Sequence, residues 1–180
     1  DNIPVIHSRA KAILTDEPSL PPVFSPNDYI ESKIYPYSID EAYDKILFHG
    51  SELRGIKKII GYSSEGIIAE ISCAPSPSKW MTDPLRNKWI GDPLVLDSAF
   101  QMSILWCFDE MGKVSLPSYL ASYRQYCNSF PADGITAIFK VNKVTNHILR
   151  GDFTFLDPDN AVVARLTGYE AVIDASLYKA

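Results

Sequence analysis

Asp97 and Gln101 stand four residues apart inside an otherwise apolar stretch that reads GDPLVLDSAFQ. In a helix this spacing places both side chains on one face. A carboxylate in an apolar setting needs a partner, because an unpaired buried charge is costly, and the Gln101 amide can donate one hydrogen bond to it. Burial favours the neutral form of a carboxyl group, while a nearby helix N-terminus favours the charged form. A site with these opposed effects can hold a carboxylic acid that donates a proton near neutral pH.

A purely structural role for Asp97 is the competing interpretation. The side chain could face a gap filled by solvent, or it could accept a hydrogen bond from the backbone of a neighbouring strand. Because perturbed buried acids are often only structural, the spacing alone favours this structural role over general-acid chemistry.

The element that carries the pair is predicted to be one long helix, from about residue 93 to residue 111. Asp92 stands where an N-cap belongs, a proline follows at the first helical position, where it is best tolerated, and Gly112 is a natural stop. Apolar residues cover most of the circumference, which is typical of a buried helix. The helix therefore has to lie in the core and carry Asp97 there.

Strand patterns surround this helix on both sides. Two strands are predicted before it, around residues 56–62 and 66–73, and a short helix before those has the capping-box spacing of Ser38 and Glu41. Residues 74–93 predict an irregular loop. One long buried helix with antiparallel strands predicts the α+β class, with a curved sheet wrapped around the helix. The strand-like runs after the helix are LPSYLASYRQYC, GITAIFKVNKVT, HILRGDFTFL and AVVARLTGYEAVI.

The N-terminal part of the chain differs from the rest in composition. Residues 3–14 alternate loosely and predict a strand, and the stretch EPSLPPVFSPND after them carries four prolines, which fix an extended linker. We therefore expect three parts, which are a leading strand from a preceding half over 1–16, a linker over 17–34 and one domain over 35–180.

Bulk composition argues against several classes of function. The 180 residues fit about one domain, and a formal charge of -5 with no basic stripe argues against a nucleic-acid surface. Three cysteines without close spacing favour a reducing, cytoplasmic compartment, and none has neighbours at metal-ligand spacing. The most apolar segment, 94–108, is too short to span a bilayer. The sequence therefore predicts a cytoplasmic protein without metal, nucleic acid or membrane among its partners.

Taken with four further segments, GDPLVLDSAFQ resembles the second active-site motif of polyketide-synthase-type dehydratase domains, H-P-x-L-L-D-x-x-x-Q. LFHGSELRGIKKI is similar to the family's L-F-H-G-P-x-F-x-G segment, and LPSYLASYRQY to its L-P-x-S-I-x-x-x-x-x-Y strand. GDFTFLDPDNAVVARLTGYEA resembles the closing pair of strands, and VIHSRAKAIL resembles the last strand of the preceding half. The segments stand in the family's order, and dehydratases of polyunsaturated fatty-acid synthases share this layout.

The resemblance implies a double hotdog, in which each of two tandem folds wraps an antiparallel sheet around a long helix, with this chain as the second, C-terminal half. It implies removal of water from a 3-hydroxyacyl chain on an acyl carrier protein, which gives a 2-enoyl thioester. Asp97 falls on the acid that protonates the departing hydroxyl, and Gln101 falls on the residue that orients this acid. No metal or organic cofactor is implied, since the substrate is carried on the phosphopantetheine of the carrier.

The resemblance also implies tunnel residues and reveals a missing base. His49, Gly50, Leu53 and Pro93 fall beside the substrate tunnel, although a loop imidazole bonded to backbone explains His49 equally well. The family's base is a His in the motif H-x-x-x-G-x-x-x-x-P of the first hotdog, which has no counterpart in this sequence. His147 begins H-x-x-x-G but lacks the proline, so we expect it at a strand end or in a turn.

We therefore expect a dehydratase chain that carries the acid, lacks the base and needs the upstream hotdog half of the same polypeptide. An isolated hotdog leaves a sheet edge uncovered, so we also expect self-association as a two-fold homodimer. The alternative is a non-catalytic hotdog, or a product-template-like domain, that binds and shapes a polyketide intermediate.

Overall fold

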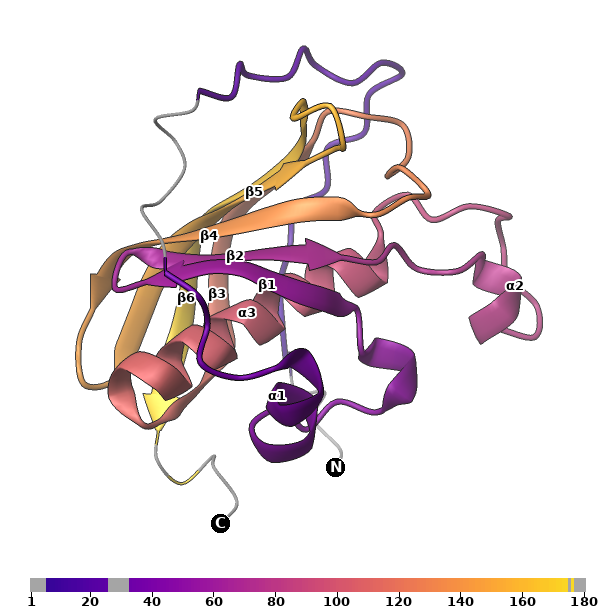
Figure 1. The fold of residues 1–180 in the computed structure, drawn as a ribbon. Coiled ribbons are helices and arrows are strands. Elements are labelled where there is room, and N and C mark those ends of the chain that lie inside the picture. Colours follow the sequence, from indigo (N-terminus) through magenta and orange to yellow (C-terminus); the bar gives the residue numbers. More distant parts are fainter. Residues whose placement is uncertain (1–5, 26–32, 175, 177–180) are drawn as a thin grey trace, which may run out of the picture.

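Six antiparallel strands form one curved sheet, and a long helix packs against it (Figure 1). The computed structural model describes residues 6–25, 33–174 and 176. Neighbouring strands are hydrogen-bonded in the order β1-β2-β4-β5-β6-β3. This is the predicted α+β arrangement of a sheet around a helix. The strands are β1 (Ile56–Ser63), β2 (Gly66–Ile71), β3 (Val114–Gln125), β4 (Ile135–Val144), β5 (Ile148–Leu156) and β6 (Val162–Asp174).

The central helix, α3 (Pro93–Met111), has the predicted bounds and the predicted end residues. The Asp92 side chain accepts a hydrogen bond from the Val95 backbone at 2.9 Å and so caps the N-terminus. Gly112 adopts a φ of 62°, a left-handed conformation that costs glycine little, and its N–H closes the last turn on the Phe108 carbonyl at 2.8 Å. Local chemistry therefore fixes both ends of α3.

Aromatic and aliphatic side chains fill the space between α3 and the sheet. Phe139 and Phe153 stack with ring centroids 4.4 Å apart, and Tyr169 meets Phe153 edge-on at 5.2 Å. Removing apolar surface from water in this way contributes about 25 cal/mol for each Å². The core thereby holds α3 along the sheet. The largest fully buried side chains include Trp106, Tyr169, Phe139, Phe153, Phe155 and Met102.

Two short helical elements precede the sheet, and both lie near α3. The first, α1 (Ile39–Lys45), begins with the predicted capping box, in which Ser38 and Glu41 satisfy each other's backbone amides. The second is the single 3-10 turn η2 (Ser51–Leu53). Together they bring the loop that contains His49 to the start of β1.

Gly55 lets this loop approach the helix closely. A Cβ atom at position 55 would lie 2.2 Å from the Ser98 hydroxyl oxygen and 2.8 Å from the Leu94 side chain. Such distances are well inside van der Waals contact, so a side chain here would push the start of β1 away from α3. The glycine therefore sets the spacing between the loop and the helix that carries Asp97.

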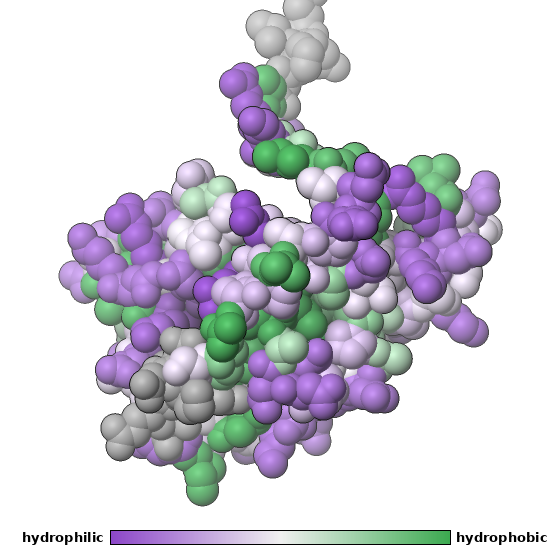
Figure 2. All heavy atoms as spheres, turned by 90° about the horizontal axis from the view of Figure 1, so that it is seen from above, coloured by the Kyte–Doolittle hydropathy of each residue, from purple (hydrophilic) through white to green (hydrophobic). Residues whose placement is uncertain are grey.

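Two regions differ from the sequence-based expectation. Residues 77–80, inside the predicted irregular loop, form the short helix α2 (Pro77–Trp80), with a proline at its first position. Residues 6–15 form no strand, because no described segment pairs with their N–H and C=O groups; residues 1–5 lie outside the described residues. Figure 2 shows this segment, with hydrophobic and hydrophilic side chains interspersed, standing off the body of the molecule. The proposed domain boundaries stay a prediction.

Candidate active site

Asp97 and Gln101 form the hydrogen bond that their spacing predicts. Gln101 Nε2 donates to Asp97 Oδ2 at 2.7 Å across one turn of α3. Gln101 is fully buried, whereas 34% of the Asp97 side chain is exposed. The carboxyl group is therefore held from the protein side and partly exposed to solvent on the other.

Three further groups fix the orientation of the Gln101 amide. Its Nε2 also donates to the Leu53 carbonyl at 2.7 Å, and its Oε1 accepts from the Tyr43 hydroxyl at 2.8 Å. The Tyr43 oxygen in turn accepts from the Ile56 backbone N–H at 2.9 Å. A flipped amide would set its oxygen against the Leu53 carbonyl, so only the observed orientation satisfies every group. The donor side of Gln101 must therefore face Asp97.

Burial gives the Tyr43 hydroxyl a strong preference for its neutral form. Desolvation raises the pKa of Tyr43 to about 12, and the hydrogen bond from the Ile56 amide and the nearby Arg54 charge oppose part of this shift. The hydroxyl therefore keeps its proton at any physiological pH. The hydrogen bond from the Tyr43 hydroxyl to the Gln101 oxygen therefore does not depend on pH in this range.

His49 lies beside the Asp97 carboxyl. Its Nε2 atom is 3.7 Å from Asp97 Oδ2, which is too long for a direct hydrogen bond, and its ring stacks on Phe48 with centroids 4.5 Å apart. Desolvation lowers the pKa of His49, and the Asp97 charge opposes part of that shift. The Nδ1 atom is buried without a hydrogen-bond partner among the described residues. His49 is therefore a neutral imidazole close to the acid.

The other residues named in the sequence analysis lie at different places around Asp97. The Leu53 backbone carbonyl accepts a hydrogen bond from Gln101. Gly50 is the exposed N-cap of η2, and Pro93 is the first residue of α3, one turn before Asp97. His147 is exposed in the turn between β4 and β5, as predicted. The roles assigned to these residues in binding substrate stay predictions.

Tyr43 is the site residue that sequence reasoning missed. It lies 58 residues before Gln101, on a separate helix, and an aromatic residue on the apolar side of a short helix is ordinarily a core residue. No sequence pattern distinguishes a tyrosine whose hydroxyl is needed from one whose ring is needed. Only the tertiary fold brings the two side chains together.

The described residues at this site include a group that can transfer a proton. No group of three or more His, Cys, Asp or Glu side chains among them could hold a metal ion. Asp97 can exchange a proton with a bound molecule, and Gln101 can hold the carboxyl group while it does so. Among the residues that the structure describes, no helix is long and apolar enough to cross a bilayer.

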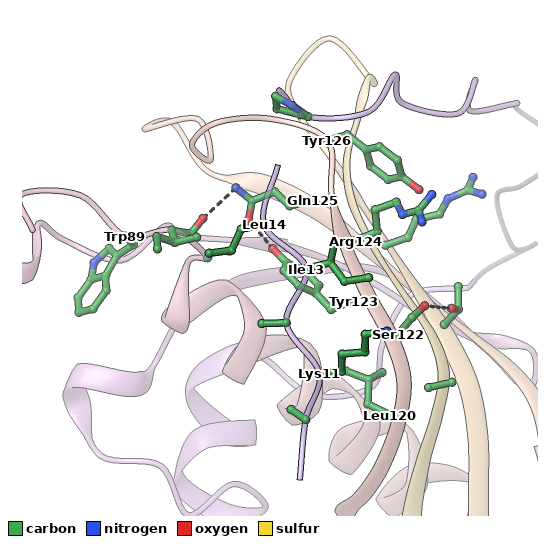
Figure 3. Close-up of a pocket in the computed structure, with 18 of the residues that line it drawn as sticks. Lys11, Ile13, Leu14, Trp89, Leu120, Ser122, Tyr123, Arg124, Gln125 and Tyr126 are labelled. Atoms are coloured by element: carbon green, nitrogen blue, oxygen red, sulfur yellow. Dashed lines mark hydrogen bonds between the residues drawn. The ribbon is translucent and has the colours of Figure 1, made fainter. Parts of the chain in front are cut away.

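A separate groove lies along β3. It has a volume of about 2080 Å³ and runs between the N-terminal segment and β3, without Asp97 among the residues that line it. Figure 3 shows Lys11, Ile13 and Leu14 of the N-terminal segment facing side chains of β3. The acid therefore lies outside this groove.

Comparison with known proteins identifies the family. The family model described as polyketide synthase dehydratase N-terminal domain matches residues 32–172, which is most of the chain. The chain therefore belongs to the polyketide synthase dehydratase family. A curated relative, one of the subunits of the polyunsaturated fatty acid synthase of Thraustochytrium sp. (strain ATCC 26185 / S-3), is 26% identical over 106 residues. That match covers 59% of this chain but 4% of the relative, so the chain spans a small part of that protein.

Solved structures show the same fold. A trans-AT polyketide synthase dehydratase domain from Brevibacillus brevis is 21% identical, with a TM-score of 0.60 over 77% of this chain and 48% of that one. The dehydratase domain of the CurF module of curacin polyketide synthase is 20% identical, with a TM-score of 0.59 over 77% of this chain and 47% of that one. The predicted hotdog fold is thereby confirmed, and the chain spans about half the length of these structures.

Proposed function

We propose that this chain supplies the general acid of a dehydratase that removes water from a 3-hydroxyacyl chain on an acyl carrier protein and gives a 2-enoyl thioester. The observation that carries the proposal is Asp97 itself, partly exposed on one side and held on the other by a fully buried Gln101. The exposed part of the side chain can meet a bound molecule while Gln101 holds the carboxyl group in place.

In this reaction Asp97 gives its proton to the β-hydroxyl oxygen of the substrate. A base removes the α-proton, and the electron pair of that carbon–hydrogen bond forms the new double bond. The carbon–oxygen bond breaks, and its electron pair leaves with the oxygen as water. A positioned acid or base contributes roughly 10²- to 10⁴-fold to such a step. Gln101 holds one carboxyl oxygen, which leaves the other free to face the hydroxyl.

The base is assigned to the upstream half of a double hotdog, with this chain as the second half. Two observations support that assignment, although the matching family model is described as an N-terminal domain. The stretch around Asp97 resembles the motif of the second half, and the 180 residues contain no H-x-x-x-G-x-x-x-x-P. The carrier protein is the proposed partner, and no metal or organic cofactor is needed for the step.

The test joins this chain to its upstream neighbour and supplies a 3-hydroxybutyryl thioester on a carrier protein. We expect Asp97→Asn to lower kcat by at least about 100-fold, since asparagine keeps the shape but cannot donate the proton. Asp159→Asn is the matched control, because Asp159 is exposed in the turn between β5 and β6. Equal enoyl formation by wild type and Asp97→Asn would remove Asp97 from the mechanism.

A further inference from the structure

His49 approaches the same oxygen of Asp97 that Gln101 holds. The His49 Nε2 atom lies 3.7 Å from Asp97 Oδ2, and Gln101 Nε2 donates to that oxygen at 2.7 Å. No side chain or backbone group of the described residues donates a hydrogen bond to the other oxygen, Oδ1. Two nitrogen atoms of the protein therefore face Oδ2, and Oδ1 is the oxygen left for a bound molecule.

The His49 ring is more enclosed than the carboxyl group that it faces. Only 10% of its side chain is exposed, against 34% for the side chain of Asp97. The ring stacks on Phe48, with centroids 4.5 Å apart. A ring enclosed in this way is poorly placed to take a proton from a substrate carbon, so any influence of His49 on the reaction passes through Asp97.

The surroundings of the ring favour one of its two neutral forms. Desolvation lowers the pKa of His49, and a neutral imidazole carries one N–H donor and one bare nitrogen. The Nδ1 atom is buried without a hydrogen-bond partner among the described residues. A proton on Nδ1 would leave that donor unsatisfied and would turn the lone pair of Nε2 toward the carboxyl oxygen. A proton on Nε2 instead gives a donor that faces Asp97 Oδ2.

Two donors that face one oxygen decide where the acidic proton of Asp97 lies. A protonated carboxyl group has one hydroxyl oxygen and one carbonyl oxygen, and the carbonyl oxygen is the better acceptor. Because Gln101 and His49 both face Oδ2, the proton belongs on Oδ1. When Asp97 gives this proton away, the same two donors face the negative charge that develops, and hydrogen bonds to a charged group are the stronger ones.

We propose that His49 is a positioning residue that donates from Nε2 to Asp97 Oδ2 during dehydration and so keeps the acidic proton on Oδ1. The inference rests on the proposed function, because that function makes Asp97 the acid. The separation of 3.7 Å is longer than a hydrogen bond, and catalytic hydrogen bonds are often long without substrate and shorten once it is bound. The loop has room to move, since a Cβ atom at Gly50 would meet no atom within 4 Å.

The test compares two substrates on the carrier protein, with this chain joined to its upstream half. Loss of water from the 3-hydroxybutyryl thioester needs an acid for the departing oxygen. In the 3-chlorobutyryl thioester the base takes the α-proton, the carbon–chlorine bond breaks and its electron pair leaves as chloride, so no acid is needed. We expect His49→Phe, which keeps an aromatic ring against Phe48, to lower kcat at least about tenfold for the hydroxy substrate and less than about twofold for the chloro substrate.

Two further variants show which property of His49 matters. Glutamine carries an N–H donor at about the position of Nε2, so His49→Gln should keep most of kcat for the hydroxy substrate. His147→Phe is the matched control, because His147 is exposed in the turn between β4 and β5, and it should equal wild type on both substrates. An equal loss on both substrates in His49→Phe, no loss on either, or a His49→Gln variant as slow as His49→Phe would overturn the proposal.

Asp97→Asn separates this inference from the proposed function. A normal rate of Asp97→Asn on the hydroxy substrate would contradict both, whereas a slow Asp97→Asn beside an unaffected His49→Phe would contradict the role of His49 alone. The tautomer is tested without catalysis, because ¹⁵N NMR distinguishes a protonated ring nitrogen from a bare one. At about pH 7.5 we expect the proton of His49 on Nε2, and a proton on Nδ1 would remove the donor and overturn the proposal.

Discussion

The Gln101 amide decides how the Asp97 carboxyl group can be used. Its nitrogen donates to Asp97 and to the Leu53 carbonyl, and its oxygen accepts from Tyr43. Every polar atom of this buried side chain is therefore engaged, and the amide cannot rotate without losing hydrogen bonds. A carboxyl group held by one rigid donor keeps a fixed position while its other oxygen stays available.

Tyr43→Phe tests whether this network matters. Removing the hydroxyl leaves the Gln101 oxygen and the Ile56 N–H without their partner in a buried place, which costs about 1–3 kcal/mol of unfolding free energy. Urea denaturation measures that loss. In the joined dehydratase kcat should fall while KM changes little, because the phenyl ring still fills the space. Tyr119→Phe is the control, since 60% of Tyr119 is exposed; equal stability of the two variants would contradict the network.

His49 should make the stability depend on pH. Desolvation lowers its pKa from the ordinary 6.5, so below about pH 6.5 the unfolded chain binds more protons than the folded one. The free energy of unfolding therefore falls as the pH drops through this range, and the loss is complete once the folded pKa has been passed. His49→Gln should remove this contribution, whereas His147→Gln, in an exposed turn, should keep it.

The measurement is urea denaturation of wild type and both variants between about pH 7.5 and about pH 5. Wild type and His147→Gln should lose more stability on acidification than His49→Gln does. Parallel curves for all three proteins would show that His49 is not desolvated in the folded state.

At the scale of elements, local chemistry explains which parts of the fold could be predicted. The bounds of α3 follow from a capping aspartate, a proline and a glycine that act within one turn, so the sequence alone identifies them. The strand predicted over 3–14 stays a prediction, because it was expected to pair within a preceding half and its described part, residues 6–14, pairs with no described segment. The contact of Tyr43 with Gln101 depends on packing between helices, which no local pattern contains.

Asp92 connects the chain after β2 to the start of α3. Replacing it by alanine or asparagine distinguishes the contribution of its hydrogen bonds from that of its charge. Its carboxylate accepts from Val95 at 2.9 Å and from the Ala74 backbone at 2.9 Å and 3.1 Å, which ties the chain after β2 to the start of α3. Burial raises the pKa of Asp92, so the charge itself is costly there. Asp92→Ala should lower the free energy of unfolding by about 1–3 kcal/mol, because one cap and one buried N–H lose their acceptor.

Asp92→Asn is the matched variant for this prediction. Asparagine is also a good N-cap and carries no charge, so we expect it to retain most of the stability that alanine loses. Urea denaturation compares the three proteins. An asparagine variant as unstable as the alanine variant would mean that the charge, rather than the hydrogen bonds, stabilises this junction.

At the scale of the whole molecule, an uncovered sheet edge is expected from the sequence, whereas the groove beside it is not. The groove along β3 collects residues from Arg9 to Arg165, and the outer edge of β3 has no strand partner among the described residues. The groove arises from the closing of the sheet around α3 rather than from any one segment. An uncovered edge with a groove beside it suits a surface that meets other parts of a larger assembly. The homodimer expected from that edge stays a prediction.

The chain alone should not catalyse dehydration, because one proton-transfer group is not enough. Asp97 can protonate the leaving hydroxyl, but the α-proton must go to a base, and the sequence holds no counterpart of the family's base motif. We expect no enoyl product above background from the isolated chain, and product formation when it is joined to its upstream half. Loss of the α-proton to D₂O, followed by NMR, should likewise require the joined protein. Enoyl formation by the isolated chain at the joined rate would place the base within these 180 residues and make His49, beside Asp97, the residue to replace next.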